Sequence, residues 1–212
     1  MPLGRLIDDL LATALPVACP CGARAVPGAP CCSRCRGALR PAPDQPAPPG
    51  IDWWIAAFVY EAVARELIAR AKYRNARAAI DWLGDAIAAR WPNACTVDVV
   101  TWSPASVARR RANGVDHGAL LARRVGRRLG LRVAGVLARA GDHAQTGATL
   151  MDRRRGPQLR VCAPVAGRRV LVVDDVATTG ATLSAAARAL REAGAASVVA
   201  ATAARTPHPG LR

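Results

Sequence analysis

The chain has 212 residues, of which 51% are hydrophobic and only 4% aromatic, so its core must consist mostly of Ala, Val and Leu. No apolar run approaches the roughly 18 residues of a membrane-spanning helix. The apolar segment 3–17 contains charged residues and lacks a signal-peptide layout, so we expect a cytoplasmic protein without a membrane span. The formal net charge of +15 indicates a polyanionic partner, although a solvated basic surface would give the same count.

The N-terminal part combines a helix with two groups of cysteines. Apolar residues between Leu3 and Leu11 recur at helical spacing and predict an amphipathic helix that packs on the module after it. Two close cysteine groups follow, separated by about ten residues, which is typical of a small zinc knuckle or ribbon with tetrahedral thiolate ligands. The ligands that we expect for Zn²⁺ are Cys19, Cys21, Cys32 and Cys35.

Two features of this pattern leave alternatives open. Only one residue separates Cys19 from Cys21, where zinc knuckles normally have two or more, so a set of unligated thiols is the alternative to a metal site. Cys31 also competes with Cys32 for the same position in the ligand set.

The Pro-rich residues 41–50 predict a semi-rigid linker of polyproline character. We therefore expect the helix and cysteine module in residues 1–40 and a separate domain in residues 51–212. From Ile51 onward strands and helices alternate, which predicts an α/β domain with a mostly parallel sheet and helices on both faces. The strands are expected at 55–60, 97–101, 131–136, 170–173 and 197–203, and the helices at 62–71, 78–90, 119–129 and 183–192.

The most informative stretch begins at Val170, where a buried strand leads to the adjacent carboxylates Asp174 and Asp175. A short turn then opens into a helix, whose unpaired backbone N–H groups and positive dipole end favour a phosphate. Carboxylates just upstream of such a turn accept hydrogen bonds from ribose hydroxyls or hold hydrated Mg²⁺. The expected phosphate-binding residues are Ala177, Thr178, Thr179, Gly180, Ala181 and Thr182.

Two other phosphate motifs are absent from the sequence. A Walker loop needs Gly-Lys-Ser/Thr, but Lys72, the only lysine, is far from this turn in the sequence, and no Gly-x-Gly-x-x-Gly occurs. The stretch instead resembles the phosphoribosyl pyrophosphate (PRPP) motif of type I phosphoribosyltransferases. That resemblance implies that Asp174 and Asp175 bind the ribose hydroxyls of PRPP and that 177–182 binds its 5-phosphate. The alternative is an Asp-Asp turn followed by a Thr-capped helix.

A second candidate segment follows the strand at 97–101. It contains Arg109, Arg110 and Arg111, and a loop at the carboxyl end of a parallel strand faces the same crevice as the first. These arginines are expected to neutralise a departing pyrophosphate. They would then be catalytic residues together with the acid pair, Asp174 and Asp175. A solvated charge run is the equally weighted alternative.

Taken together, the motifs resemble the ComF family, in which a cysteine module precedes a phosphoribosyltransferase-like domain. The resemblance implies PRPP and Mg²⁺ binding, phosphoribosyl transfer to an unidentified acceptor, and a link to natural competence and DNA uptake. The residues that carry it are the two cysteine groups, Ala71-Lys72-Tyr73, the stretch ending Arg111-Ala-Asn113-Gly114, Leu137-Ala-Arg139 with Gln145, the basic segment 153–155, and Val173 to Thr182.

Two departures from the family pattern fall beside the expected pyrophosphate pocket. Asn113-Gly114-Val115-Asp116-His117 stands where the family usually has Arg-Gly-Phe-Asn-Gln, and the preceding strand ends in Thr101-Trp-Ser-Pro104. The sequence therefore predicts PRPP binding and leaves turnover open. The competing hypothesis is a non-catalytic accessory protein that binds single-stranded DNA, with competence or helicase proteins as further partners and a vestigial or regulatory PRPP site.

Overall fold

The computed structural model describes residues 19–25, 29–73, 77–92, 94–107, 111, 114–140 and 156–207. Its main sheet has four parallel strands in the order β1-β6-β5-β2, and β3 pairs with β4 in a small antiparallel ribbon. The strands are β1 (Trp53–Val59), β2 (Val99–Trp102), β3 (Leu137–Arg139), β4 (Leu159–Val161), β5 (Arg169–Ala177) and β6 (Ser197–Arg205). The helices are α2 (Ser33–Gly37), α3 (Ala62–Tyr73), α4 (Arg77–Ala89), α6 (His117–Leu129) and α8 (Ala181–Glu192).

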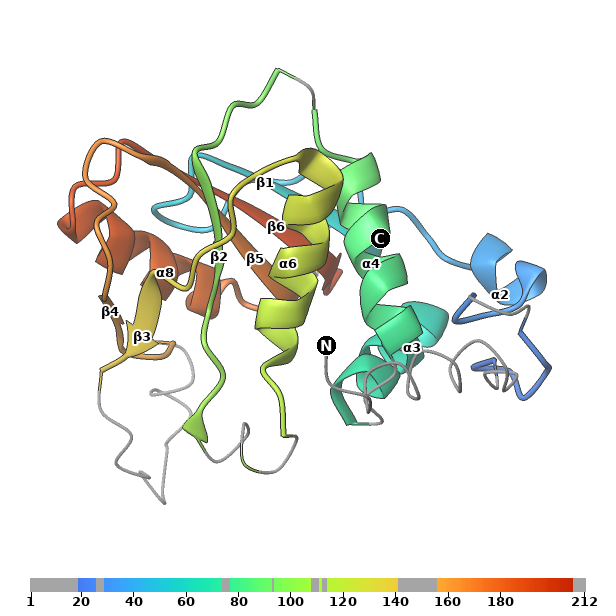
Figure 1. The fold of residues 1–212 in the computed structure, drawn as a ribbon. Helices are drawn as coiled ribbons and strands as arrows, with labels where there is room; N and C mark the ends of the chain where they lie inside the picture. The colour runs from blue at the N-terminus through green and yellow to red at the C-terminus, as the bar shows by residue number, and fades with distance from the viewer. Residues whose placement is uncertain are drawn as a thin grey trace.

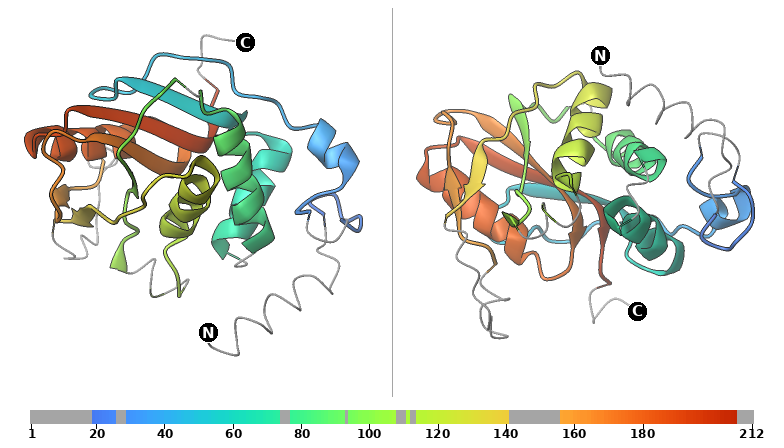
Figure 2. Two further views of the ribbon diagram at one scale, coloured as in Figure 1. Left: turned by 45° about the horizontal axis from the view of Figure 1, so that its top comes forward. Right: turned by 60° about the horizontal axis from the view of Figure 1, so that its bottom comes forward.

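Helices cover both faces of the main sheet, as the sequence predicts (Figure 1). Side chains alternate along β5, so Leu171 and Val173 pack in the core beneath α3, α4 and α6. Val170 and Val172 point the other way, into the core beneath α8. All four side chains are fully buried, which is why this strand forms a continuous apolar run in the sequence. The tilted views in Figure 2 show the same three layers.

Strand β5 is longer than the predicted segment 170–173. It continues through the acid pair to Ala177, because β6 runs alongside and supplies backbone partners as far as Arg205. The predicted strand at 131–136 is mostly wrong: the segment forms an isolated bridge from Val133 to Val100, and β3 begins only at Leu137. Strand β4 and the short helix α2 were not predicted.

The cysteine module and the Pro-rich segment both lie against the α/β body. Cys19, Cys31 and Cys35 share a small buried cluster with Leu67 of α3. The segment 41–50 runs along the sheet, and an added Cβ at Gly180 would lie 2.9 Å from Pro48. The helix predicted between residues 3 and 11 lies outside the described residues. Among the helices that are described, none is both long enough and apolar enough to cross a membrane.

Candidate functional site

The carboxyl ends of the parallel strands gather the polar residues that the sequence singles out. Asp174 and Asp175 lie near the end of β5, beside β2, which ends at Trp102 (Figure 1). Asp174 and Asp175 are both partly exposed. The turn 178–180 follows the end of β5 and leads directly into α8. Strand, acid pair, turn and helix therefore occur in space in the order that the sequence predicts.

The turn before α8 is the segment that the sequence predicts to be a phosphate cradle. Thr178 and Thr179 are exposed, and the hydroxyl of Thr179 accepts a hydrogen bond from the amide of Ala181 at 3.3 Å. Gly180 has φ +75°, a conformation that side chains with a Cβ rarely adopt, and Pro48 fills the space where a Cβ would stand. Only glycine fits here, so its residue type is fixed by the turn itself.

The β3–β4 ribbon borders the same edge of the sheet. Arg139 at the end of β3 donates from Nε to the carbonyl of Pro104, 3.0 Å away, and so connects the ribbon to the loop after β2. Gly156 lies so close to α8 that an added Cβ would stand 2.5 Å from the carbonyl oxygen of Ala181. These two contacts fix the position of the ribbon next to the turn before α8.

The acid pair has a basic partner that sequence reasoning missed. Lys72, in the last turn of α3, places its Nζ 2.8 Å from Oδ2 of Asp175, and both side chains are about a quarter exposed, at 24% and 26%. Asp174 accepts a hydrogen bond from the amide of Asp175 at 2.8 Å through its Oδ1. Lys72 is about a hundred residues from the motif in the sequence. Its signals were that it is the sole lysine and that it belongs to Ala71-Lys72-Tyr73, and neither indicated a contact with Asp175.

His117 lies beside the same ion pair. Its ring, Lys72 and Asp175 line a shallow hollow whose other walls are apolar side chains of α3, α4 and α6. Burial lowers the pKa of His117 from 6.5, against the opposing effect of the Asp116 and Asp175 carboxylates, so the ring is neutral at neutral pH.

Asp116 fixes the start of α6 and thereby the place of His117. Its Oδ1 accepts the amide of Ala119 at 3.3 Å, and its Oδ2 accepts Trp102 Nε1 at 3.2 Å and the amide of Ala105 at 3.3 Å. Its carboxylate therefore caps α6 and connects that helix to the loop after β2.

The arginine segment is only partly described. Arg109 and Arg110 lie outside the described residues, and Arg111 is exposed. Their assignment to a pyrophosphate pocket therefore stays a prediction.

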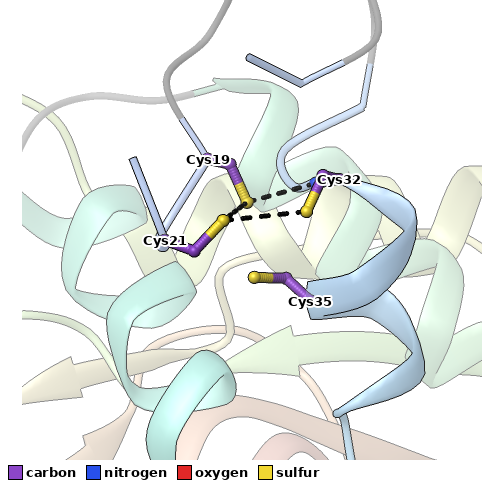
Figure 3. A group of neighbouring side chains, drawn as sticks. All are labelled: Cys19, Cys21, Cys32 and Cys35. Carbon is purple, nitrogen blue, oxygen red and sulfur yellow. Dashed lines mark hydrogen bonds between the residues drawn. The ribbon is translucent and has the colours of Figure 1, made fainter. Parts of the chain in front are cut away.

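The four predicted zinc ligands come together at the start of α2 (Figure 3). Their sulfur atoms all lie within 4.8 Å of one another, with Cys21 3.4 Å from Cys19 and 3.8 Å from Cys32. A tetrahedron of thiolates around zinc, with Zn–S bonds of about 2.3 Å, has edges of about 3.8 Å. Cys32 belongs to this group, whereas Cys31 is buried outside it. The group therefore fits a metal ion of this kind.

The pKa values of two of these thiols, Cys19 and Cys35, are shifted in opposite directions. Burial would raise the pKa of Cys19, but hydrogen bonds from the amides of Cys32 and Cys21 and from neighbouring thiols lower it to about 6. Hydrogen bonding to Cys19, together with burial, raises the pKa of Cys35 to about 12. A bound cation is what allows all four groups to be thiolates at once.

Comparison with known families agrees with this fold. Residues 114–212 match the family model of the phosphoribosyl transferase domain. The matched region contains β5, the acid pair and the turn before α8. The fold is type I phosphoribosyltransferase-like. No curated protein matches the sequence.

Several solved structures resemble the chain at low sequence identity. Glutamine PRPP amidotransferase from B. subtilis is 24% identical, with 66% of this chain and 30% of that chain covered and a TM-score of 0.49. For purine phosphoribosyltransferase from Pyrococcus horikoshii the identity is 21%, the coverage 63% and 77%, and the TM-score 0.40. Hypoxanthine-guanine phosphoribosyl transferase from L. donovani is 16% identical to this chain. The match covers 62% of this chain and 71% of that chain, with a TM-score of 0.34. This chain thus spans about a third of the length of the amidotransferase.

Proposed function

We propose that this protein binds PRPP with Mg²⁺ at the carboxyl edge of its main sheet and transfers the phosphoribosyl group to an acceptor. The observation that supports this most is the placement of Asp174 and Asp175 two residues before a turn that exposes Thr178 and Thr179 and leads into a helix N-terminus. A carboxylate pair next to an anion cradle suits a ligand that carries both vicinal hydroxyls and a phosphate.

Each part of the site has a role in this proposal. The amides and hydroxyls of 177–182 hold the 5-phosphate, and Asp174 and Asp175 accept the ribose hydroxyls and steady a sugar that gains positive charge. Mg²⁺ fits the oxygen ligands offered by Asp174, Asp175 and the pyrophosphate, and it would neutralise charge on the leaving group. Arg109, Arg110 and Arg111 are proposed to bind the departing pyrophosphate.

A ComF-like identity is the finer form of the proposal. It is supported by the joint presence of a four-cysteine group and a phosphoribosyltransferase-like domain in one chain. Zn²⁺ at Cys19, Cys21, Cys32 and Cys35 would be structural, because all four ligands come from the protein. This identity carries with it the link to competence and DNA uptake and the interior of the cell as the place of action.

The test is calorimetric titration of PRPP and Mg²⁺ into wild type and into Asp174→Asn with Asp175→Asn. We expect micromolar binding that the double substitution weakens more than a hundredfold, because two charged acceptors are lost. Asp98→Asn, at the opposite edge of the sheet, is the matched control and should bind as wild type does. Equal affinity of the double variant and wild type would refute the assignment of the acid pair.

Transfer itself is tested by pyrophosphate release. Wild type is incubated with PRPP, Mg²⁺ and each of a panel of nucleobases, with and without single-stranded DNA. Release that depends on one acceptor and is lost in the acid-pair variant supports a transferase. Binding without release for every acceptor would favour a PRPP-binding accessory role.

Binding of single-stranded DNA is a second candidate function, favoured by the net charge of +15. Contacts with phosphates predict an affinity that falls steeply with salt. Binding that is absent, or that does not change between about 50 and 200 mM salt, would eliminate this role.

A further inference from the structure

The ion pair between Lys72 and Asp175 differs from two arginine–aspartate pairs of the described residues, those of Asp98 and Asp85. Asp98 is held by Arg169, which places Nη2 2.6 Å from Oδ1 and Nε 3.2 Å from Oδ2. Asp85 is held in the same way by Arg124, at 2.7 Å and 2.6 Å. In both pairs the planar guanidinium uses both oxygens of the carboxylate.

Lys72 uses only one oxygen of Asp175. Its ammonium group contacts Oδ2 at 2.8 Å, and within the described part of the chain Oδ1 of Asp175 makes no hydrogen bond or ion pair. About a quarter of the Asp175 side chain is exposed, at 26%, so a ligand can approach it. The carboxylate is therefore neutralised and oriented on one side while its other oxygen stays available as an acceptor.

The choice of residue at position 72 is unusual for this chain. Lys and Arg together number 30, and Lys72 is the only lysine among them. Arginine is the usual partner for a carboxylate that is partly removed from water, because its fork matches both oxygens. The neighbouring Arg70, on the same turn of α3, supports the fold instead: it donates to Glu66 at 2.8 Å and to the carbonyl of Cys19 at 3.3 Å.

We propose that Lys72 is a positioning residue, which holds Asp175 through Oδ2 and leaves Oδ1 free to accept a hydroxyl of the ribose. This inference rests on the proposed function, because it takes a ribose phosphate as the ligand. An arginine that used its fork here, as Arg169 does at Asp98 and Arg124 at Asp85, would occupy both oxygens and exclude the sugar hydroxyl. Charge alone is not sufficient.

The test compares Lys72→Arg with wild type for two readouts, PRPP affinity and discrimination between sugars. The probes for the second are ribose 5-phosphate and its 2-deoxy and 3-deoxy analogues, titrated by calorimetry. Wild type should prefer ribose 5-phosphate about tenfold or more over the analogue that lacks the hydroxyl bound by Asp175. In Lys72→Arg, PRPP affinity should fall about tenfold or more and this preference should disappear.

Two further variants separate positioning from a merely structural effect. Lys72→Met removes the charge but leaves both oxygens of Asp175 accessible, so it should bind PRPP more weakly and still prefer ribose. This variant also carries the test if Lys72→Arg does not fold. Arg169→Lys, which makes the opposite exchange at the Asp98 pair, is the matched control and should change neither readout.

The outcomes also separate this inference from the proposed function. If wild type binds neither PRPP nor ribose 5-phosphate, the proposed function is refuted. If wild type binds both and Lys72→Arg keeps wild-type affinity and sugar preference, the role of Lys72 is refuted while the PRPP site stands. Loss of the sugar preference in Lys72→Met as well would also contradict it, because no fork then blocks Oδ1.

Discussion

The aspartates at the two edges of the main sheet differ in how many of their carboxylate oxygens are already in contact with a donor. At the amino edge, Asp98 receives two-pronged hydrogen bonding from Arg169, and Asp52 contacts Arg191 through Oδ1 and the amide of Val198 through Oδ2. At the carboxyl edge, Asp175 shares only one oxygen, with Lys72. Acids whose oxygens are all used support the fold, whereas a carboxylate with an available acceptor can bind a ligand.

The same contrast holds for the turns that flank β5. The turn before it contains Gly167, whose φ is +69° and whose surroundings are open. The turn after it contains Gly180, whose φ is +75° and whose Cβ position is blocked by Pro48 at 2.9 Å. One strand thus joins a permissive turn at one edge to a tightly packed turn at the other.

The largest effect is expected from a substitution in the cysteine module, which packs on α3 next to the carboxyl edge. Cys35→Ser removes one of four thiols that can surround zinc, and structural zinc sites contribute folding free energy directly. We expect a loss of bound zinc and a decrease in the free energy of unfolding on the order of several kcal/mol. Because the cysteine module packs on α3, which carries Lys72, PRPP affinity should also fall.

Metal analysis, thermal unfolding and PRPP titration measure these effects. Cys95→Ser, at a thiol outside the group, is the control and should leave zinc content unchanged. Less than half an equivalent of zinc in the wild-type protein would contradict the zinc assignment.

The next largest effect is expected from substitutions in the two turns that flank β5. Gly180→Ala should cost about 1–3 kcal/mol for the positive φ, with a further cost for the contact with Pro48, and it should weaken PRPP binding because the cradle is displaced. Gly167→Ala has the same φ cost without the crowding and should leave binding unchanged. Urea unfolding and calorimetry would show the difference. Equal losses of PRPP affinity in the two variants would contradict a ligand site confined to the carboxyl edge.

The smallest effect concerns acid stability at the amino edge. Hydrogen bonds from the side chain and amide of Arg169 lower the pKa of Asp98 from 3.8 to about 2. The unfolded chain therefore takes up this proton at a higher pH than the folded protein does, so stability from this pair is complete above pH 4 and is lost as pH falls toward 2.

Asp98→Asn should thus show a shallower loss of stability between pH 4 and pH 2, without a change in PRPP affinity at neutral pH. Urea midpoints measured across this range provide the test. If both proteins lose the same stability between pH 4 and pH 2, the pair of Asp98 and Arg169 does not contribute to stability in that range.

Sequence patterns predicted most of the fold, because the determinants are local. The apolar run at Val170 and the Ala-rich segment after Gly180 specify a buried strand and a helix by residue type alone. The end of β5 could not be predicted, since it depends on pairing with β6, a partner about thirty residues away. Strands β3 and β4 were missed because each spans only three residues, too few for a period to appear.

The site was predictable to the same extent. Asp174, Asp175 and the turn before α8 are contiguous in sequence, so their placement at one edge of the sheet could be predicted from their order. Lys72 and His117 join them only through the packing of α3 and α6 against the sheet, a relation that no local pattern carries. The grouping of the four cysteines was predicted despite irregular spacing, because two close cysteine groups are typical of a small metal site.

The most direct test of the central claim is amide hydrogen exchange, measured by mass spectrometry with and without PRPP and Mg²⁺. The account predicts slower exchange at the carboxyl edge, in residues 174–184 and the last turn of α3, because ligand binding stabilises those amides. Peptides at the amino edge, around Asp98 and Gly167, should exchange at the same rate in both states. Unchanged exchange in residues 174–184, or protection confined to the amino edge, would contradict a PRPP site at Asp174 and Asp175.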